Sequence, residues 1–263
     1  MHLYKKFRIP GLYGTDETSR FRRPPYFEEM IAYADMMQPG AAFQDAAREV
    51  PVSDDFDPIM SLTDFTSYAR HWAPPSLAQR PIKLTLNNKP CVNFYGVDTH
   101  LAQTLWTLAQ DQPTTVYYIG APQVKETGIV YDGVDQSFRN ALYTVAGAQN
   151  LYDAYALAEL KSNTGTLSTV EHVIAVVFNT TSSAIYNDSL LLKSGNIGTF
   201  PTKGFMLGGR YNSSIAGTVE PVYNKLRAFA AYDGAHDADK VAEITTFFNV
   251  DIGILSRAIE VNL

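Results

Sequence analysis

The stretch that most constrains the fold is an uninterrupted apolar run over residues 173–178, followed by two shorter apolar segments. The run is too short for a typical helix and is rich in β-branched residues, so it predicts a strand buried on both faces. The segments at 184–186 and 190–193 are separated by Asn187 and Asp188, which favour tight hairpins because they tolerate positive φ. We therefore expect antiparallel β structure around this hairpin.

The composition indicates a folded, sheet-rich protein. Of the 263 residues, 46% are hydrophobic and 18% are charged, and the chain contains 16 Tyr and 14 Phe. The net charge of −6 argues against nucleic-acid binding as the main role. The single cysteine, Cys91, excludes an intrachain disulfide, and its neighbours predict a buried thiol. With no signal peptide or apolar run of membrane-spanning length in this sequence, we expect the protein to be made and folded in a cytoplasm.

Residues 1–80 differ in composition from the rest of the chain and form the first of two predicted parts. Pro and Gly breakers predict an extended arm over residues 1–25. Helical spacing of apolar residues predicts helices near 28–37, 41–50 and 61–72. The segment has few long apolar faces, so we expect it to lean on the β domain or on a partner. The arm is either a solvated tail or a docking element for other proteins, and its candidate docking residues are Lys5, Lys6, Arg8, Tyr13, Arg20, Arg22, Arg23 and Tyr26.

The second predicted part is residues 81–263, where the pattern changes to short apolar or alternating segments. Their spacing of about ten residues is typical of a β-sandwich or barrel. A closing helix is expected because Asp237 can cap residues 238–248, whose apolar side chains share one helical face. The expected strands cover residues 82–86, 91–94, 114–120, 127–131, 138–145, 152–160, 173–178, 184–186, 190–193, 207–211 and 223–232.

Four pieces of this second part resemble one known family. Residues 88–101 (NKPCVNFYGVDTHL) resemble the opening strand of concanavalin A-like, or laminin G-like, domains, and residues 172–192 resemble their central hairpin. Residues 207–211 (LGGRY) and 225–248 look like a late strand and the closing strand and helix of that family. The resemblance covers about residues 81–250. It implies an all-β fold, an antiparallel two-sheet jelly-roll sandwich with a short C-terminal helix, behind an extended, partly helical N-terminal segment.

Two departures from the family pattern leave that expectation intact: Ser189 replaces the usual hairpin glycine, and residues 215–223 look like an insertion. Similar domains with an unrelated N-terminal segment occur in tailed-phage virion proteins and in bacterial surface proteins. The resemblance therefore implies a non-enzymatic structural component of a phage particle, as a capsid decoration or a tail or baseplate protein. Its location would be the virion, and its partners would be other virion proteins and further copies of itself.

The sequence carries no recognisable catalytic array. Glucanases that the fold resembles place carboxylates on one strand as Glu-x-Asp-x-x-Glu, and no such array occurs here. The five histidines lack metal-ligand spacing, and no nucleophile elbow or phosphate loop is present. The acidic cluster at 54–57 predicts a solvated loop more than a calcium site. We expect no enzyme activity, no metal and no cofactor, with a glycoside hydrolase of unfamiliar carboxylates as a minor alternative.

A carbohydrate-binding module that recognises a cell-surface glycan is the main alternative function. Such a site needs aromatic side chains and planar polar groups that converge on the ligand. The two functions are compatible, because a virion lectin would perform both, and a host-surface glycan would then be a further partner. Neither nucleic acid nor a membrane is an expected partner. The candidate ligand-binding residues, which could equally be rim residues that pack on the sandwich, are Trp106, Tyr131, Asp132, Tyr211 and Asn212.

Overall fold

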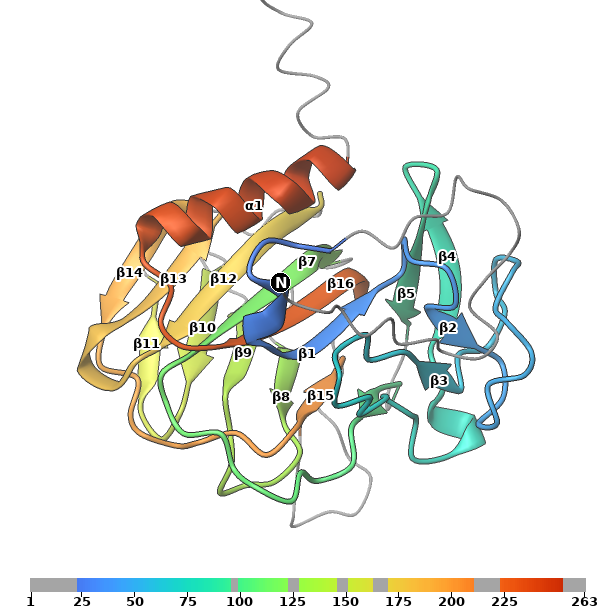
Figure 1. The fold of residues 1–263 in the computed structure, drawn as a ribbon, viewed down its shortest axis with the longest axis horizontal. Coiled ribbons are helices and arrows are strands. Elements are labelled where there is room, and N and C mark those ends of the chain that lie inside the picture. Colours follow the sequence, from blue (N-terminus) through green and yellow to red (C-terminus); the bar gives the residue numbers. More distant parts are fainter. Residues whose placement is uncertain are drawn as a thin grey trace, which may run out of the picture.

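In a computed structural model of the protein, two antiparallel sheets pack face to face and one long helix follows the last strand (Figure 1). The two-sheet sandwich with a C-terminal helix that the sequence predicts is therefore confirmed. The structure describes residues 23–95, 99–122, 128–145, 151–162, 170–210 and 223–252.

The larger sheet has eight strands within this described part of the chain. The eighth strand, β1 (Met30–Asp35), pairs with the second half of β16, so β16 has β7 along one side and β5 followed by β1 along the other. The other seven strands are, in spatial order, β14 (Leu190–Gly195), β13 (Ser183–Asn187), β12 (His172–Phe178), β7 (Thr114–Pro122), β16 (Asn224–Asp233), β5 (Lys89–Phe94) and β4 (Ile82–Leu86).

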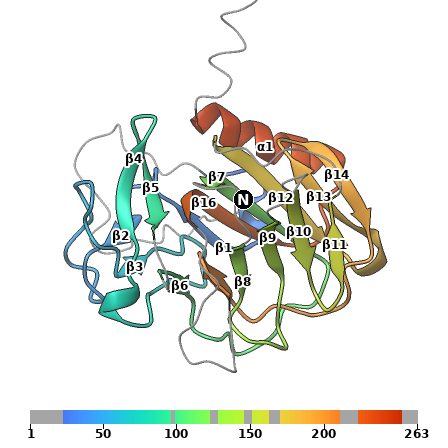
Figure 2. The same cartoon turned by 180° about the vertical axis from the view of Figure 1, so that it is seen from behind.

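The smaller sheet has six strands among the described residues, and Figure 2 shows four of them, β8 to β11, side by side. Their spatial order is β11 (Glu159–Lys161), β10 (Leu151–Tyr155), β9 (Ala141–Val145), β8 (Gly128–Gly133), β15 (Phe205–Leu207) and β6 (Leu101–Ala102). The remaining elements are the strand pair β2 (Ala42–Phe43) and β3 (Ser61–Leu62), the helix α1 (Ala238–Ile252), and the 3-10 turns η1 (Phe27–Glu29), η2 (Leu77–Gln79) and η3 (Thr180–Ser182).

An aromatic core joins the two sheets. Phe205 of β15 and Phe229 of β16 are in contact, with ring centroids 5.0 Å apart and ring planes tilted by 60°. The ring of Tyr131 packs edge-on against that of Phe229 at 5.5 Å, and Trp72, from the N-terminal part, does so at 5.9 Å. Such edge-to-face contacts add to the stabilisation that comes from burying the rings. Residues 30–72 therefore share the core of the sandwich, which confirms that they lean on the β domain.

The outer face of the larger sheet is also covered. Tyr117 and Tyr232, on β7 and β16, pack against His236, and Val241 and Ile244 of α1 are fully buried. Helix α1 lies along the β12–β14 side of the sheet (Figure 1). A strand in a sheet that is covered on both faces needs apolar side chains on both sides. This explains the uninterrupted apolar run in β12. The predicted burial of this run on both faces is confirmed.

A buried ion pair marks the point where the neighbour of β16 changes from β5 to β1. Arg227 lies at a bulge of β16 against β7, and its side chain is 2% exposed. Its guanidinium donates to both carboxylate oxygens of Glu171, which precedes β12. It also donates to the carbonyl oxygens of Pro90 and Leu86, each at 3.2 Å, around the turn between β4 and β5. One side chain thus ties three segments of the chain together.

The helices predicted near residues 28–37, 41–50 and 61–72 are wrong. Strand β1 occupies most of the first, with all six residues buried against β16, so pairing with an existing sheet outweighs helical spacing. In the second, the Asp45 carboxylate accepts hydrogen bonds from the amides of Glu49 and Val50, which fixes a loop. Residues 1–22 lie outside the described chain, and the domain boundary at residue 80 stays a prediction.

The predicted strands after residue 81 are confirmed in most cases. The strand predicted over 207–211 is not found among the described residues, because β15 ends at Leu207. A second exception is more informative. The segment 152–160 is not one strand but the two strands β10 and β11, joined by a turn in which Leu157 has a φ of 86°. The turn contains no Gly, Pro or Asn, the residues that usually indicate a turn in a sequence. The hairpin between β13 and β14 is confirmed, and its Asp188 and Ser189 have φ values of 47° and 68°, as a type I′ turn requires.

Candidate functional site

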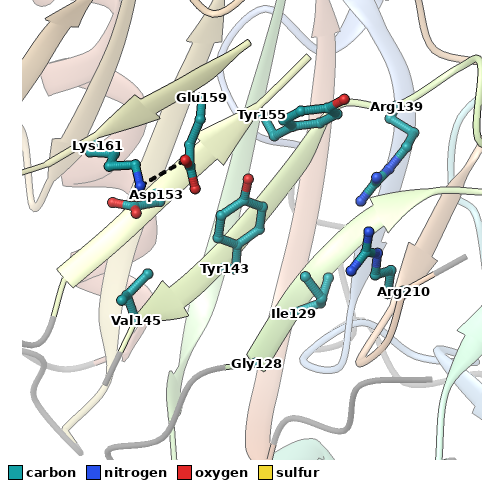
Figure 3. Close-up of a pocket in the computed structure, with 10 residues that line it drawn as sticks. All are labelled: Gly128, Ile129, Arg139, Tyr143, Val145, Asp153, Tyr155, Glu159, Lys161 and Arg210. Carbon is teal, nitrogen blue, oxygen red and sulfur yellow. Dashed lines mark ion pairs between the residues drawn. The ribbon is translucent and has the colours of Figure 1, made fainter. Parts of the chain in front are cut away.

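The outer face of the smaller sheet carries a shallow hollow of about 410 Å³ (Figure 3). No helix among the described residues covers this sheet face, and along β9 and β11 buried residues alternate with more exposed ones. Successive side chains of a strand point to opposite faces, so the side chains that point outward line the hollow. The residues that line it are Gly128, Ile129, Arg139, Tyr143, Val145, Asp153, Tyr155, Glu159, Lys161 and Arg210.

Strand register brings the polar side chains of the hollow together. Asp153 of β10 lies between Tyr143 of β9 and Lys161 of β11, its direct partners on the two sides. Tyr155, two residues further along β10, is paired with Glu159. Directly paired residues of antiparallel strands have Cβ atoms about 5 Å apart, so these five side chains form one continuous surface.

Two tyrosines supply the aromatic part of the hollow. Tyr155 is held by its neighbours: the guanidinium carbon of Arg139 lies 4.9 Å from its ring centroid, and the ring of Phe200 packs edge-on at 6.3 Å. Burial, with a further contribution from Glu159, raises the pKa of the Tyr143 hydroxyl. Tyr143 is therefore a neutral phenol that can both donate and accept a hydrogen bond.

The carboxylates at one end of the hollow interact with each other and with a lysine. The Lys161 ammonium lies 2.8 Å from a Glu159 oxygen (Figure 3, dashed line). Burial raises the pKa of Asp153, and the charge of Glu159 raises it further. The backbone amide of Ser162 donates to Asp153 at 3.2 Å, which fixes the orientation of this carboxylate. Fixed carboxylate oxygens and an ammonium can bind the hydroxyl groups of a polar ligand.

The opposite end of the hollow contains two arginines (Figure 3). Arg139 makes a bidentate pair with Asp132 of β8, with Nε–Oδ1 and Nη2–Oδ2 distances of 2.9 and 2.7 Å. Asp132 is fully buried, and burial raises its pKa, although the hydrogen bonds from Arg139 and the charge of Arg210 act in the opposite direction. The two-point geometry holds the Arg139 guanidinium in a fixed plane over the ring of Tyr155.

The sequence-predicted binding residues are not brought together in one site. Asp132 lies under the hollow as the partner of Arg139. Tyr131 points the other way, into the core, and is fully buried. Trp106 is 6% exposed and packs edge-on against Phe205, at a second location. The other two candidates, Tyr211 and Asn212, lie outside the described residues.

The second location is a hollow of about 420 Å³ beside Trp106. Arg70 lines it, and its guanidinium carbon lies 4.0 Å from the ring centroids of both Trp106 and Tyr68. The Trp106 ring nitrogen donates to Gln103 at 3.2 Å. The aromatic faces here are thus already occupied by a side chain of the same protein, and the hollow on the smaller sheet is the better candidate.

Two of the predicted docking residues of the N-terminal arm are described. The Tyr26 hydroxyl donates to Glu243 of α1 at 2.6 Å, and the Lys240 ammonium lies 4.4 Å from its ring centroid. The guanidinium of Arg23 lies 3.5 Å from Glu28 and 5.0 Å from the ring of Phe27. These contacts are within the chain, and docking on a partner stays a prediction. The other predicted docking residues, Lys5, Lys6, Arg8, Tyr13, Arg20 and Arg22, lie outside the described residues.

None of the residues that line the hollow was a predicted binding residue, and the predicted Asp132 lies beneath them. The signal that could have found them is the alternation of Tyr143 and Val145 on one side of β9 and of Asp153 and Tyr155 on one side of β10. The two carboxylates, Asp153 and Glu159, lie on β10 and β11, which the sequence pattern predicts as one strand. As one extended strand, residues 152–160 would hold Asp153 and Glu159 about 20 Å apart, whereas the turn folds them onto one surface.

Within the described chain, no group of three or more His, Cys, Asp or Glu side chains is arranged to hold a metal ion. The same residues include no helix that is long and apolar enough to cross a membrane.

No protein-family model matches the sequence, and no curated protein matches it. Solved structures do match its fold. The ligand-binding domain of botulinum neurotoxin serotype D, in complex with N-acetylneuraminic acid, has a TM-score of 0.56 at 7% identity over 83% of this chain and 51% of that one. An arabinofuranosidase complexed with arabinofuranosyl-α-1,2-xylobiose has a TM-score of 0.54 at 14% identity over 72% and 50%. A Trypanosoma rangeli sialidase has a TM-score of 0.51 at 11% identity over 83% and 33%.

These similarities define the class of the fold, a lectin-like jelly-roll β-sandwich, which is consistent with the concanavalin A-like resemblance of the sequence. This chain matches about half of the length of the toxin domain and of the arabinofuranosidase, and a third of the sialidase. Identities of this size establish the fold alone. The function must be argued from the site.

Proposed function

We propose that this protein binds carbohydrate through the hollow on the outer face of the smaller sheet. The observation that carries the proposal is the convergence of Tyr143 and Tyr155 with Asp153, Glu159 and Lys161 on one open surface. A sugar ring presents C–H groups on its faces and hydroxyl groups around its edge. Aromatic side chains suit the former, and charged groups in fixed positions suit the latter.

The size and shape of the hollow also fit this role. Its volume of about 410 Å³ lies within the range of small-ligand sites, and it is open along the sheet face. The solved structures with the same fold include two that hold a sugar ligand, N-acetylneuraminic acid in one case and arabinofuranosyl-α-1,2-xylobiose in the other. These ligands support a sugar as the ligand class. The position of the proposed site is argued from the residues of this chain alone.

Binding without hydrolysis is the form of the proposal that the geometry favours. A glycosidase typically needs two carboxyl groups on either side of the glycosidic bond, one as general acid and the other as base or nucleophile. Here the two carboxyl groups that line the hollow, Asp153 and Glu159, lie together at one end of it, and Glu159 is paired with Lys161 at 2.8 Å. Release of reducing sugar by the purified protein, abolished by Glu159→Gln, would show instead that the site is catalytic.

The test is glycan binding by the intact chain and by two variants. Screening on a glycan array should identify a ligand, and Tyr143→Ala and Tyr155→Ala should each weaken its binding by about tenfold, the equivalent of about 1.4 kcal/mol. The matched control is Tyr68→Ala, which removes an exposed tyrosine from the other hollow and should leave the affinity unchanged. A blank array, or equal losses in the control, would contradict the proposal.

The role in a phage particle stays a prediction of the sequence resemblance, together with self-association and docking on other virion proteins. It is compatible with glycan binding, because a sandwich anchored through residues 1–80 would leave the open face of its smaller sheet available to a ligand. Cosedimentation of the protein with a purified particle, and loss of that association when the first 22 residues are removed, would support it. A protein that stays monomeric and binds no particle protein would contradict it.

A further inference from the structure

The second hollow, beside Trp106, contains an arginine that is held between two aromatic rings. The guanidinium carbon of Arg70 lies 4.0 Å from the ring centroids of Tyr68 and Trp106. Among the described residues, no group accepts a hydrogen bond from this guanidinium or forms an ion pair with it. Contacts with aromatic rings occupy the faces of a guanidinium, so the N–H groups around its edge stay available to an acceptor.

The nearby carboxylate of Asp64 is used by the backbone. Asp64 is buried, and its oxygens accept hydrogen bonds from backbone amides, including the amide of Arg70 at 3.0 Å. The Arg70 guanidinium therefore differs from that of Arg139 in the first hollow, whose N–H groups already bind Asp132.

Gln103 fixes the position of Arg70 and of one of its rings. Gln103 is buried, and its Nε2 donates to the carbonyl oxygen of Arg70 at 2.7 Å, while its Oε1 accepts from the ring nitrogen of Trp106 at 3.2 Å. The bond from the Arg70 amide to Asp64 holds the backbone on the other side. A guanidinium that is held in place before binding loses less conformational entropy when it binds an anion.

Exposed apolar side chains lie beside this cation. Leu105 and Leu108 also line the hollow and are 53% and 80% exposed, and Tyr68 is 54% exposed. Tyr and Arg are enriched in protein–protein interfaces, and apolar side chains that gather on a surface mark such sites. The hollow thus combines an open cationic group with an apolar rim.

We propose that this hollow docks an acidic segment of a partner protein, with a Glu or Asp carboxylate on Arg70 and a neighbouring apolar side chain on Leu105 and Leu108. A guanidinium matches a carboxylate with two parallel charge-assisted hydrogen bonds. Of the described residues that line the hollow, Arg70 alone is charged. It neutralises a carboxylate, whereas a phosphate group with a charge of about −2 would keep part of its charge. This docking goes beyond the proposed function and uses a different surface.

The test is binding of the full chain to an array of hexapeptides. Each peptide has a central Glu or Asp flanked by Leu, Ile, Phe or Tyr, and each has a twin with Gln or Asn in place of the acid. Acidic peptides should bind about tenfold more tightly than their amide twins in fluorescence-polarisation titrations, because the twins lose the charge-assisted bonds.

Four variants locate the binding. Arg70→Gln should remove the preference for the acidic peptide, and Arg70→Lys, which keeps the charge but loses the fork, should reduce it. Leu108→Ser changes an exposed side chain, so the variant should fold normally and bind acidic and amide peptides more weakly. Lys193→Gln, which removes an exposed cation from β14 of the larger sheet, is the matched control and should change nothing. Thermal unfolding of each variant checks that it is folded.

Several outcomes would overturn the proposal. It is wrong if no peptide binds, if acidic peptides and their amide twins bind equally, or if Arg70→Gln weakens both equally. If free isocaproate, an acid with a branched apolar tail, competes as strongly as the best peptide, the hollow is a site for a small acid and docking of a protein segment is wrong. Tyr143→Ala should leave peptide binding unchanged, so this result is independent of the glycan experiment.

Discussion

Replacing Glu171 with Gln tests the buried ion pair at the bulge of β16. The side chains of Arg227 and Glu171 are 2% and 4% exposed, so both charges have been removed from water. The substitution preserves the shape of Glu171 and leaves the guanidinium without its counter-charge. Removing one partner of a buried pair typically costs about 3–5 kcal/mol, because the remaining charge has no compensation. We expect the free energy of unfolding to fall by about 4 kcal/mol.

Urea denaturation followed by tryptophan fluorescence measures this loss, since Trp72 is fully buried next to Phe229. For a slope of about 2.5 kcal/mol per M, a loss of about 4 kcal/mol lowers the unfolding midpoint by about 1.6 M. The informative partner is the double variant Glu171→Leu with Arg227→Met, which removes both charges. It should recover at least half of the loss, because an apolar pair of similar volume needs no counter-charge.

Two results would refute this reasoning. A midpoint that moves by less than about 0.3 M in Glu171→Gln would mean that the guanidinium is solvated or compensated elsewhere. A double variant less stable than the single one would mean that the bonds from Arg227 to Pro90 and Leu86, and not the charge pair, hold this junction. Hydrogen exchange in the β4–β5 hairpin would then rise in the double variant alone.

Three further predictions concern the same core. Gly120→Ala should destabilise the protein by about 3 kcal/mol, because the added Cβ would lie 2.2 Å from the Lys225 carbonyl oxygen, and thermal unfolding would show it. Burial lowers the pKa values of His71 and His236 to about 4, below the ordinary value of 6.5, so the unfolded chain takes up these protons first. Stability should therefore fall as the pH drops from about 6.5 to 4 and stay constant above 7, with the decrease reduced in His236→Gln; an unchanged melting temperature across that window would contradict this. Burial raises the pKa of Cys91 to about 11, so the thiol should resist a disulfide reagent at pH 8 until urea unfolds the chain.

The fold was predictable where the residue types of a segment indicate its burial or its turn directly. The apolar run in β12 indicated two covered faces, and Asn187 and Asp188 indicated the hairpin after it, although the two residues with positive φ are Asp188 and Ser189. The N-terminal part was not predictable in the same way. Strand β1 has apolar residues at helical spacing, and only its pairing with β16, some 200 residues later in the chain, selects the extended conformation.

The site was harder to predict than the fold, and the reason is the turn at Leu157. Without a Gly, Pro or Asn to mark it, β10 and β11 look like one strand, which places Asp153 and Glu159 far apart. Aromatic residues in the sequence also do not reveal which face they occupy. Tyr131 and Tyr143 both lie in strands of the smaller sheet, yet the first is fully buried in the core and the second is on the open face.

In the proposed function the two sheets have different tasks, because the described residues cover more of the outer face of the larger sheet than of the smaller one. The larger sheet packs on the smaller sheet on one side, and α1 and the residues around Tyr26 cover part of its other side, so its buried side chains serve packing. Among the described residues no helix covers the outer side of the smaller sheet, and the polar side chains of β11 on that side stay exposed to water, which avoids the cost of burying them. Changes at Gly120 or Glu171 should therefore alter stability at constant affinity, whereas changes at Tyr143 should alter affinity at nearly constant stability. A variant of the larger sheet that folds fully but loses glycan binding would show that the two tasks are not separate.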